Sequence, residues 1–136
     1  MIDFDNTTDL SYDPAPLEAI AAALTEAVVE TVLVDDETIR ALNLEHRGLD
    51  KPTDVLSFPI EPFAGAPLGS VIISVDTAQK QAQALGHGTD EEIAVLFLHG
   101  LLHLLGFDHE CDRGEMAAKE RELREKFHLP LGLTER

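Results

Sequence analysis

The feature that most constrains the fold is a segment without Asp, Glu, Lys or Arg at residues 93–105. Placed on a helix at about 100° per residue, its apolar side chains cover every side. A helix that is apolar all round is a buried one, so this helix is expected at the centre of the protein. The capping-box pattern at residues 89–92 predicts its start, and Gly106 predicts its end.

Hydrophobic periodicity predicts a small sheet covered by helices around this segment. Strands are expected at residues 2–4, 31–34, 55–60 and 70–75, and helices at residues 14–30, 36–46, 76–85, 89–105 and 113–127. The link between the last two strands is too short for a crossover helix, so these strands should pair antiparallel. The length of 136 residues suits one domain, residues 1–136. The pattern predicts an α+β, or layered α/β, fold.

Charge is distributed unevenly along the chain. The formal net charge is -16, and residues 1–39 hold ten acidic and no basic side chains. Because phosphate binding draws on Lys and Arg, this acidic third is expected to serve solubility. A single cysteine and an N-terminus without the features of a secretory signal favour a cytoplasmic protein. No window is apolar enough to predict a membrane span.

The central helix carries two histidines, His99 and His103, which stack one turn apart on the same flank. A buried imidazole without a partner costs about 1–3 kcal/mol, and a lone buried histidine is usually a satisfied core residue. One divalent cation would satisfy both rings, and a turn at Gly106 would let His109 reach the same point. Three imidazoles and an open fourth position predict a catalytic zinc site.

Two neighbours of this motif have open roles. Asp108 is either a carboxylate that orients an imidazole from outside the ligand set or a turn residue. Cys111 is either a small, partly exposed residue or a fourth ligand that would close the site.

The spacing H-x-x-x-H-x-x-G-x-x-H is shared with the metzincin peptidases. Those enzymes carry a glutamate, the general base, directly after the first histidine, where this chain has Gly100. The ligand pattern is therefore zincin-like, whereas peptidase chemistry does not follow from it. A metallopeptidase remains an alternative, as does a non-catalytic module that the metal only stabilises.

A second group of candidate residues lies in LNLEHRGLDKPTDVLSFP, residues 42–59. Arg47 is expected at a helix end beside Gly48, and its guanidinium suits a phosphate. Lys51 follows in the same loop. The alternative for Arg47 is an exposed arginine in a salt bridge.

HGLLHLLGFDH, together with NLEHRGLDKPTDVLSFP and PLGSVIIS, closely resembles the YbeY-type endoribonucleases, the ribosomal-RNA maturation factors of bacteria. The resemblance extends in order over nearly the whole chain, as far as Met116 and Glu120. It implies a four-stranded mixed sheet with flanking helices. This chain has Ser70 where the family usually has aspartate and His46 where it commonly has tyrosine, and both departures could alter the wall of the cleft.

The resemblance also implies a function and assigns residues to it. It implies a cytoplasmic, zinc-dependent, single-strand-specific endoribonuclease that acts in 3′-end maturation of small-subunit ribosomal RNA and in ribosome quality control. His99, His103 and His109 would hold one zinc per chain, His99 and Arg47 would be catalytic, and Arg47 with Lys51 would bind the substrate. The expected partners are single-stranded RNA, ribosomal RNA and the ribosome or its proteins, with no membrane and no DNA. No residue is assigned as general base.

Overall fold

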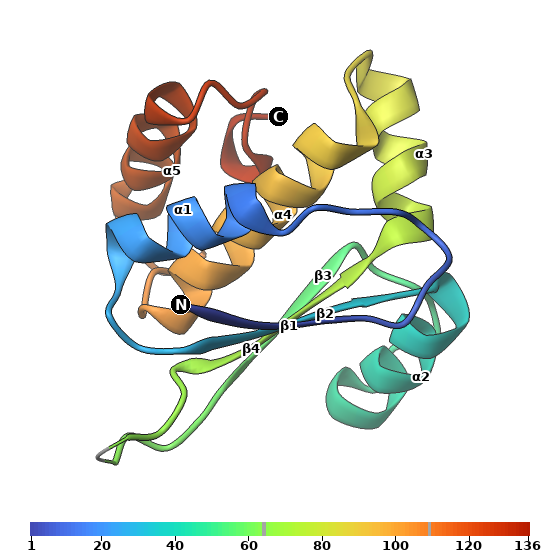
Figure 1. The fold of residues 1–136 in the computed structure, drawn as a ribbon, viewed down its shortest axis with the longest axis horizontal. Coiled ribbons are helices and arrows are strands. Elements are labelled where there is room, and N and C mark those ends of the chain that lie inside the picture. Colours follow the sequence, from blue (N-terminus) through green and yellow to red (C-terminus); the bar gives the residue numbers. More distant parts are fainter. Residues whose placement is uncertain (64, 109) are drawn as a thin grey trace.

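The computed structural model describes residues 1–63, 65–108 and 110–136. Within them it forms a four-stranded sheet and five α-helices (Figure 1). The elements are β1 (Ile2–Asn6), α1 (Ala15–Leu24), β2 (Val29–Val34), α2 (Asp36–Arg47), β3 (Val55–Pro59), β4 (Gly69–Ser74), α3 (Val75–Leu85), α4 (Thr89–Leu104), α5 (Glu115–Lys126) and a short 3-10 helix η1 (Leu133–Glu135). The predicted α+β class with a small mixed sheet is confirmed. None of the helices in these ranges is both long and apolar enough to cross a bilayer.

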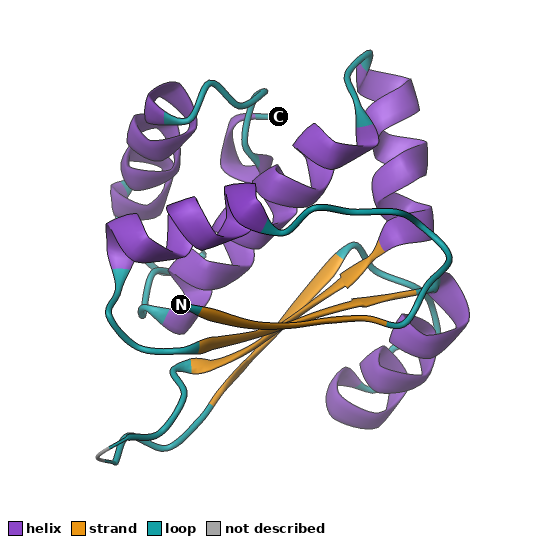
Figure 2. Cartoon of the chain, viewed as in Figure 1, coloured by secondary structure: helices purple, strands orange, loops and turns teal. Residues whose placement is uncertain are grey.

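The sheet has the order β1-β2-β4-β3. β1, β2 and β4 are parallel, and β3 is an edge strand antiparallel to β4, as the short link between them predicts. On one side of the sheet lie α1, α3 and α4, with α5 packed against α4 farther from the strands, while α2 lies alone on the other face (Figure 2). The sheet therefore separates a large core from a small one built on Val34, Ile39 and Leu56.

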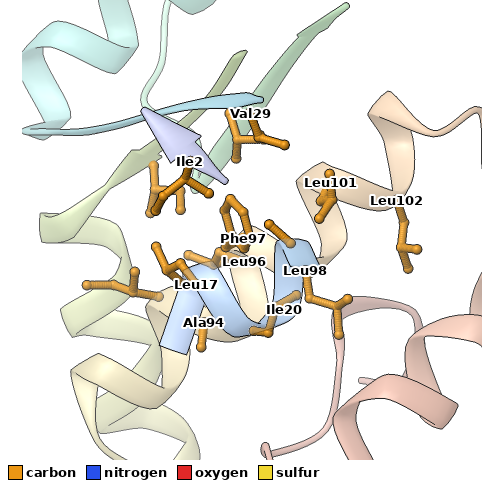
Figure 3. Close-up of a cluster of buried hydrophobic side chains, with 14 of the residues drawn as sticks. Ile2, Leu17, Ile20, Val29, Ala94, Leu96, Phe97, Leu98, Leu101 and Leu102 are labelled. Atoms are coloured by element: carbon orange, nitrogen blue, oxygen red, sulfur yellow. The ribbon is translucent and has the colours of Figure 1, made fainter. Parts of the chain in front are cut away.

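The large core is built around α4, as its apolar circumference requires. Phe97 and Leu96 of this helix face Ile2 and Val29 of the sheet and Leu17 of α1 (Figure 3). Leu98, Leu101 and Leu102 are also buried, so α4 is enclosed on all sides. This position fixes whatever side chains α4 carries against the neighbouring elements.

The predicted end of the first helix and the predicted cap of α4 are wrong, while the other bounds agree within two residues. The first helix ends at Leu24 rather than residue 30, because Thr25 is extended and its hydroxyl accepts the Ala27 N–H. Val29 then begins β2, which pairs on both sides with β1 and β4, so tertiary hydrogen bonding overrides the helical pattern. The cap of α4 is Gly88 rather than Thr89, and Glu91 Oε1 accepts the Gly88 N–H at 3.1 Å.

Gly100 is a point of close approach between α4 and the sheet. A Cβ at this position would lie 2.8 Å from Val71 Cγ1, 3.0 Å from Ser57 Oγ and 3.1 Å from Val55 Cγ2. The Ser57 hydroxyl also donates to the Gly100 carbonyl oxygen at 2.9 Å. The glycine thus lets the edge strand β3 lie directly against α4.

We expect Gly100→Ala to lower the free energy of unfolding by about 1 kcal/mol. Overpacking costs about 1–3 kcal/mol, which outweighs a gain of about 1 kcal/mol from helix propensity. Val71→Ala in the same chain removes the closest contact, so the double variant should lose less stability than the two single variants added together. Urea unfolding measures all three, and strictly additive losses would contradict this packing.

Candidate metal centre and its cavity

The two described histidines of the predicted metal motif face each other. Both lie in the last turns of α4, and His99 Nε2 is 3.1 Å from His103 Nε2. Two ligands of a tetrahedral zinc, each at about 2.0–2.1 Å, lie about 3.3 Å apart. The pair therefore fits two positions of such an ion.

The third predicted ligand, His109, lies outside the described residues. The chain approaches it through a turn at Gly106, whose φ of 97° is in the left-handed region that favours glycine. Among the described residues, no group of three or more His, Cys, Asp or Glu side chains is arranged to hold a metal. The described part of the predicted centre is thus the pair His99 and His103.

Glu120 fixes the orientation of His99. This residue of α5 is fully buried, and its Oε2 accepts a hydrogen bond from His99 Nδ1 at 2.9 Å. An ionised carboxylate only accepts, so the ring proton belongs on Nδ1 and the Nε2 lone pair points toward His103. A carboxylate behind the ligating imidazole is the usual arrangement at histidine metal sites.

Glu120 belongs to the site, although its role was not predicted from the sequence. The signal that could have found it is its place on the apolar stripe of α5, where Met116, Glu120 and Leu123 recur at helical spacing and are all buried. A glutamate on such a stripe needs a buried partner. The spacing alone does not tell which partner.

A cavity of about 530 Å³ opens in front of the two histidines. Its wall includes Arg47 from the end of α2, Ser57 from β3, and Asp108 and Glu110 from the turn after α4. Of the two predicted basic residues, Arg47 reaches this wall. Lys51 is exposed and does not belong to the described lining.

Local structure explains the position of Arg47. Asp35 caps α2, with its carboxylate accepting the Thr38 N–H at 2.9 Å, and Gly48 ends the helix in the left-handed region. The buried Asn43 then donates from Nδ2 to the Lys51 carbonyl oxygen at 2.9 Å, which holds the following loop against the helix. This loop leads directly into β3 along the cavity.

Asp108 is exposed and has the geometry of a turn residue. Its Oδ1 accepts the Glu110 N–H at 3.1 Å, and its carbonyl oxygen accepts the Cys111 and Asp112 N–H groups. The other predicted role of Asp108, that its carboxylate orients an imidazole, stays a prediction. Cys111 is exposed, and the hydrogen bond with Asp108 raises the pKa of its thiol. The neutral thiol is the weaker metal ligand.

The two departures from the family pattern lie outside the described cavity wall. The Ser70 hydroxyl donates to Glu30 Oε2 at 2.8 Å, between β4 and β2. The His46 ring packs on the Phe58 ring with a centroid distance of 4.7 Å.

Comparison with known proteins yields consistent matches over the chain. The family model described as Endoribonuclease YbeY matches residues 15–128. The Endoribonuclease YbeY of Nautilia profundicola is 56% identical over 100% of this chain and 98% of its own length. The protein of the same name from Wolinella succinogenes is 52% identical, over 100% of this chain and 97% of its own length.

A solved structure has the same fold. The solution structure of TM1509 from Thermotoga maritima is similar with a TM-score of 0.64 and 25% sequence identity. The match covers 93% of this chain and 89% of that protein.

Proposed function

This chain belongs to the Endoribonuclease YbeY family, and we propose that it is a zinc-dependent endoribonuclease specific for single-stranded RNA. We further propose that it acts in the cytoplasm, in 3′-end maturation of small-subunit ribosomal RNA and in ribosome quality control. The observation that carries the chemistry is the pair of facing imidazoles, His99 and His103, beside a cavity that also receives Arg47.

The residues of this chain divide the work of phosphodiester hydrolysis. His99, His103 and His109 would hold one zinc ion, with Glu120 keeping His99 Nε2 directed at it. When bound, zinc would supply Lewis-acid activation of water at neutral pH. The Arg47 guanidinium would bind the scissile phosphate and offset the charge that builds in the transition state. Lys51 in the next loop and Asp108 at the cavity wall are proposed supporting residues.

The negative net charge of the chain suggests that RNA binding depends partly on a partner. With a net charge of -16, the protein offers little general attraction for a polyanion. We therefore propose that ribosomal proteins or the ribosome itself supply part of the binding. DNA and membranes are not expected partners.

The alternative of a metallopeptidase is disfavoured by the packing of Gly100. A peptidase of this ligand spacing needs a glutamate there as general base. In this fold even a Cβ at that position would press against Val71, Ser57 and Val55 of the sheet. A carboxylate at residue 100 could not reach the cavity without displacing β3.

We expect the zinc-loaded protein to cleave single-stranded RNA and to leave both a perfect RNA duplex and unfolded casein intact. The duplex is the matched control, because it carries the same phosphates in a stiffer backbone. Cleavage should stop with a chelator and return with added zinc, as followed on denaturing gels. Casein cleavage would support the peptidase, and unfolding on chelation without any RNA cleavage would support a metal that only stabilises the fold.

A further inference from the structure

Residues 131–136, which we call the C-terminal tail, cover the side of Glu120 that faces away from His99. The tail lies beyond the part of the chain that the family model matches, residues 15–128. We propose, on the basis of the function proposed above, that the tail is a positioning element for the metal centre. It acts through Glu120 on His99, with Thr134 and Gly132 as the positioning residues.

Thr134 supplies hydrogen bonds to the buried carboxylate. Its backbone N–H and its hydroxyl both donate to Glu120 Oε1, at 3.0 and 3.2 Å. His99 Nδ1 donates to the other oxygen, Oε2, at 2.9 Å. The tail therefore satisfies the oxygen that the imidazole does not reach. Without these donors a fully buried carboxylate would be left with one oxygen unsatisfied, and rotating toward water would break its bond to His99.

Gly132 gives the tail its close approach to the carboxylate. A Cβ at this position would overlap the Oε1, Cδ and Cγ atoms of Glu120. The backbone of Gly132 has φ -73° and ψ 171°, which any residue adopts. A glycine is thus required here for space and not for conformation, and the atoms that need the space belong to the group that orients His99.

The tail is anchored to both helices that supply the His99–Glu120 pair. Arg124 of α5, the helix of Glu120, donates to the Glu135 carboxylate at 2.7 and 2.9 Å, and holds the pKa of that group below its usual value. Arg136 donates to the buried Glu92 of α4, the helix of His99, at 2.7 and 2.5 Å. In Figure 1 the C-terminal end lies between α5 and α4. Two ion pairs therefore fix the tail to the two helices whose spacing decides the hydrogen bond to His99.

The test compares the zinc dissociation constants of full-length variants in competition with a chromogenic chelator. Gly132→Ala should weaken zinc binding by about 10–100-fold, the usual effect of losing a partner behind a metal-ligating histidine. Thr134→Val should weaken zinc binding less, because the backbone N–H still donates to Glu120. Thr134→Ser keeps the hydroxyl and should bind zinc with the wild-type affinity. The matched control is Gly88→Ala, which also lies in extended backbone before a helix, but where the added Cβ meets only the Glu91 side chain at 3.3 Å.

A second readout reports orientation without metal. In metal-free protein, the ring nitrogens of His99 should show one tautomer with the proton on Nδ1 by NMR, and Gly132→Ala should show a mixture. RNA cleavage by the variants should recover at saturating zinc, because Gly132 and Thr134 do not belong to the described cavity wall.

The outcomes separate this inference from the function on which it rests. Wild-type protein that binds zinc and cleaves RNA, with unchanged zinc affinity in both Gly132→Ala and Thr134→Val, would overturn the role of the tail and leave the proposed function standing. Wild-type protein that binds no zinc would overturn both. Should Gly132→Ala fail to fold by circular dichroism, the comparison of Thr134→Val with Thr134→Ser decides.

Discussion

Replacing His103 with alanine is expected to abolish zinc binding and RNA cleavage together. The change removes one of the two imidazoles whose Nε2 atoms lie 3.1 Å apart, so the proposed site of His99, His103 and His109 would keep only two of its three ligands. A catalytic metal supplies several kcal/mol of transition-state stabilisation, so kcat/KM should fall by at least about 1,000-fold. Metal content by mass spectrometry and cleavage of a labelled single-stranded RNA measure the two effects on the same sample.

The control for this prediction is His128→Asn. His128 is exposed after α5 and has a φ of 56°, a conformation that asparagine tolerates. The His128→Asn substitution removes an imidazole that does not line the described cavity, so zinc content and cleavage should stay at the wild-type level. Undiminished cleavage by metal-free His103→Ala protein would refute the proposed mechanism.

Replacing Arg47 with alanine is expected to lower RNA cleavage while zinc stays bound. Arg47 lines the cavity but is not one of the proposed metal ligands. Its loss therefore removes a positive charge from the proposed phosphate site and leaves the two histidines in place. Removing one preorganised donor from a transition state costs about 100–1,000-fold in kcat. Arg47→Lys should restore part of the activity, because a lysine keeps the charge but not the bidentate fork.

The matched control is Arg40→Ala on the same helix. Arg40 Nε donates to Asp50 Oδ1 at 2.8 Å, both side chains are more than half exposed, and neither belongs to the described cavity wall. Removing it changes the net charge by the same amount, so any general electrostatic effect on RNA binding should appear equally in both variants. Loss of zinc from Arg47→Ala would show instead that Arg47 is structural.

Much of the architecture was predictable because it depends on local patterns. The uncharged run of α4 required a central helix, and the structure encloses it. The short link between β3 and β4 required antiparallel pairing, which the register confirms. Where the prediction was wrong, at residues 25–30, the Thr25 hydroxyl accepts the Ala27 N–H and β2 pairs with two neighbouring strands from Val29 onward, and together these contacts override the helical pattern.

The sequence by itself determined that two histidines share one flank of a buried helix, because residues four apart on a helix are neighbours whatever surrounds them. It also carried the residues by which the family is recognised. The tertiary structure decided what stands behind and around those histidines. Glu120 is 21 positions from His99, the tail that holds Glu120 follows at Thr134, and the sheet that closes on Gly100 comes from strands far earlier in the chain. Contacts between distant segments depend on how whole elements pack, and no periodicity within one segment contains that information.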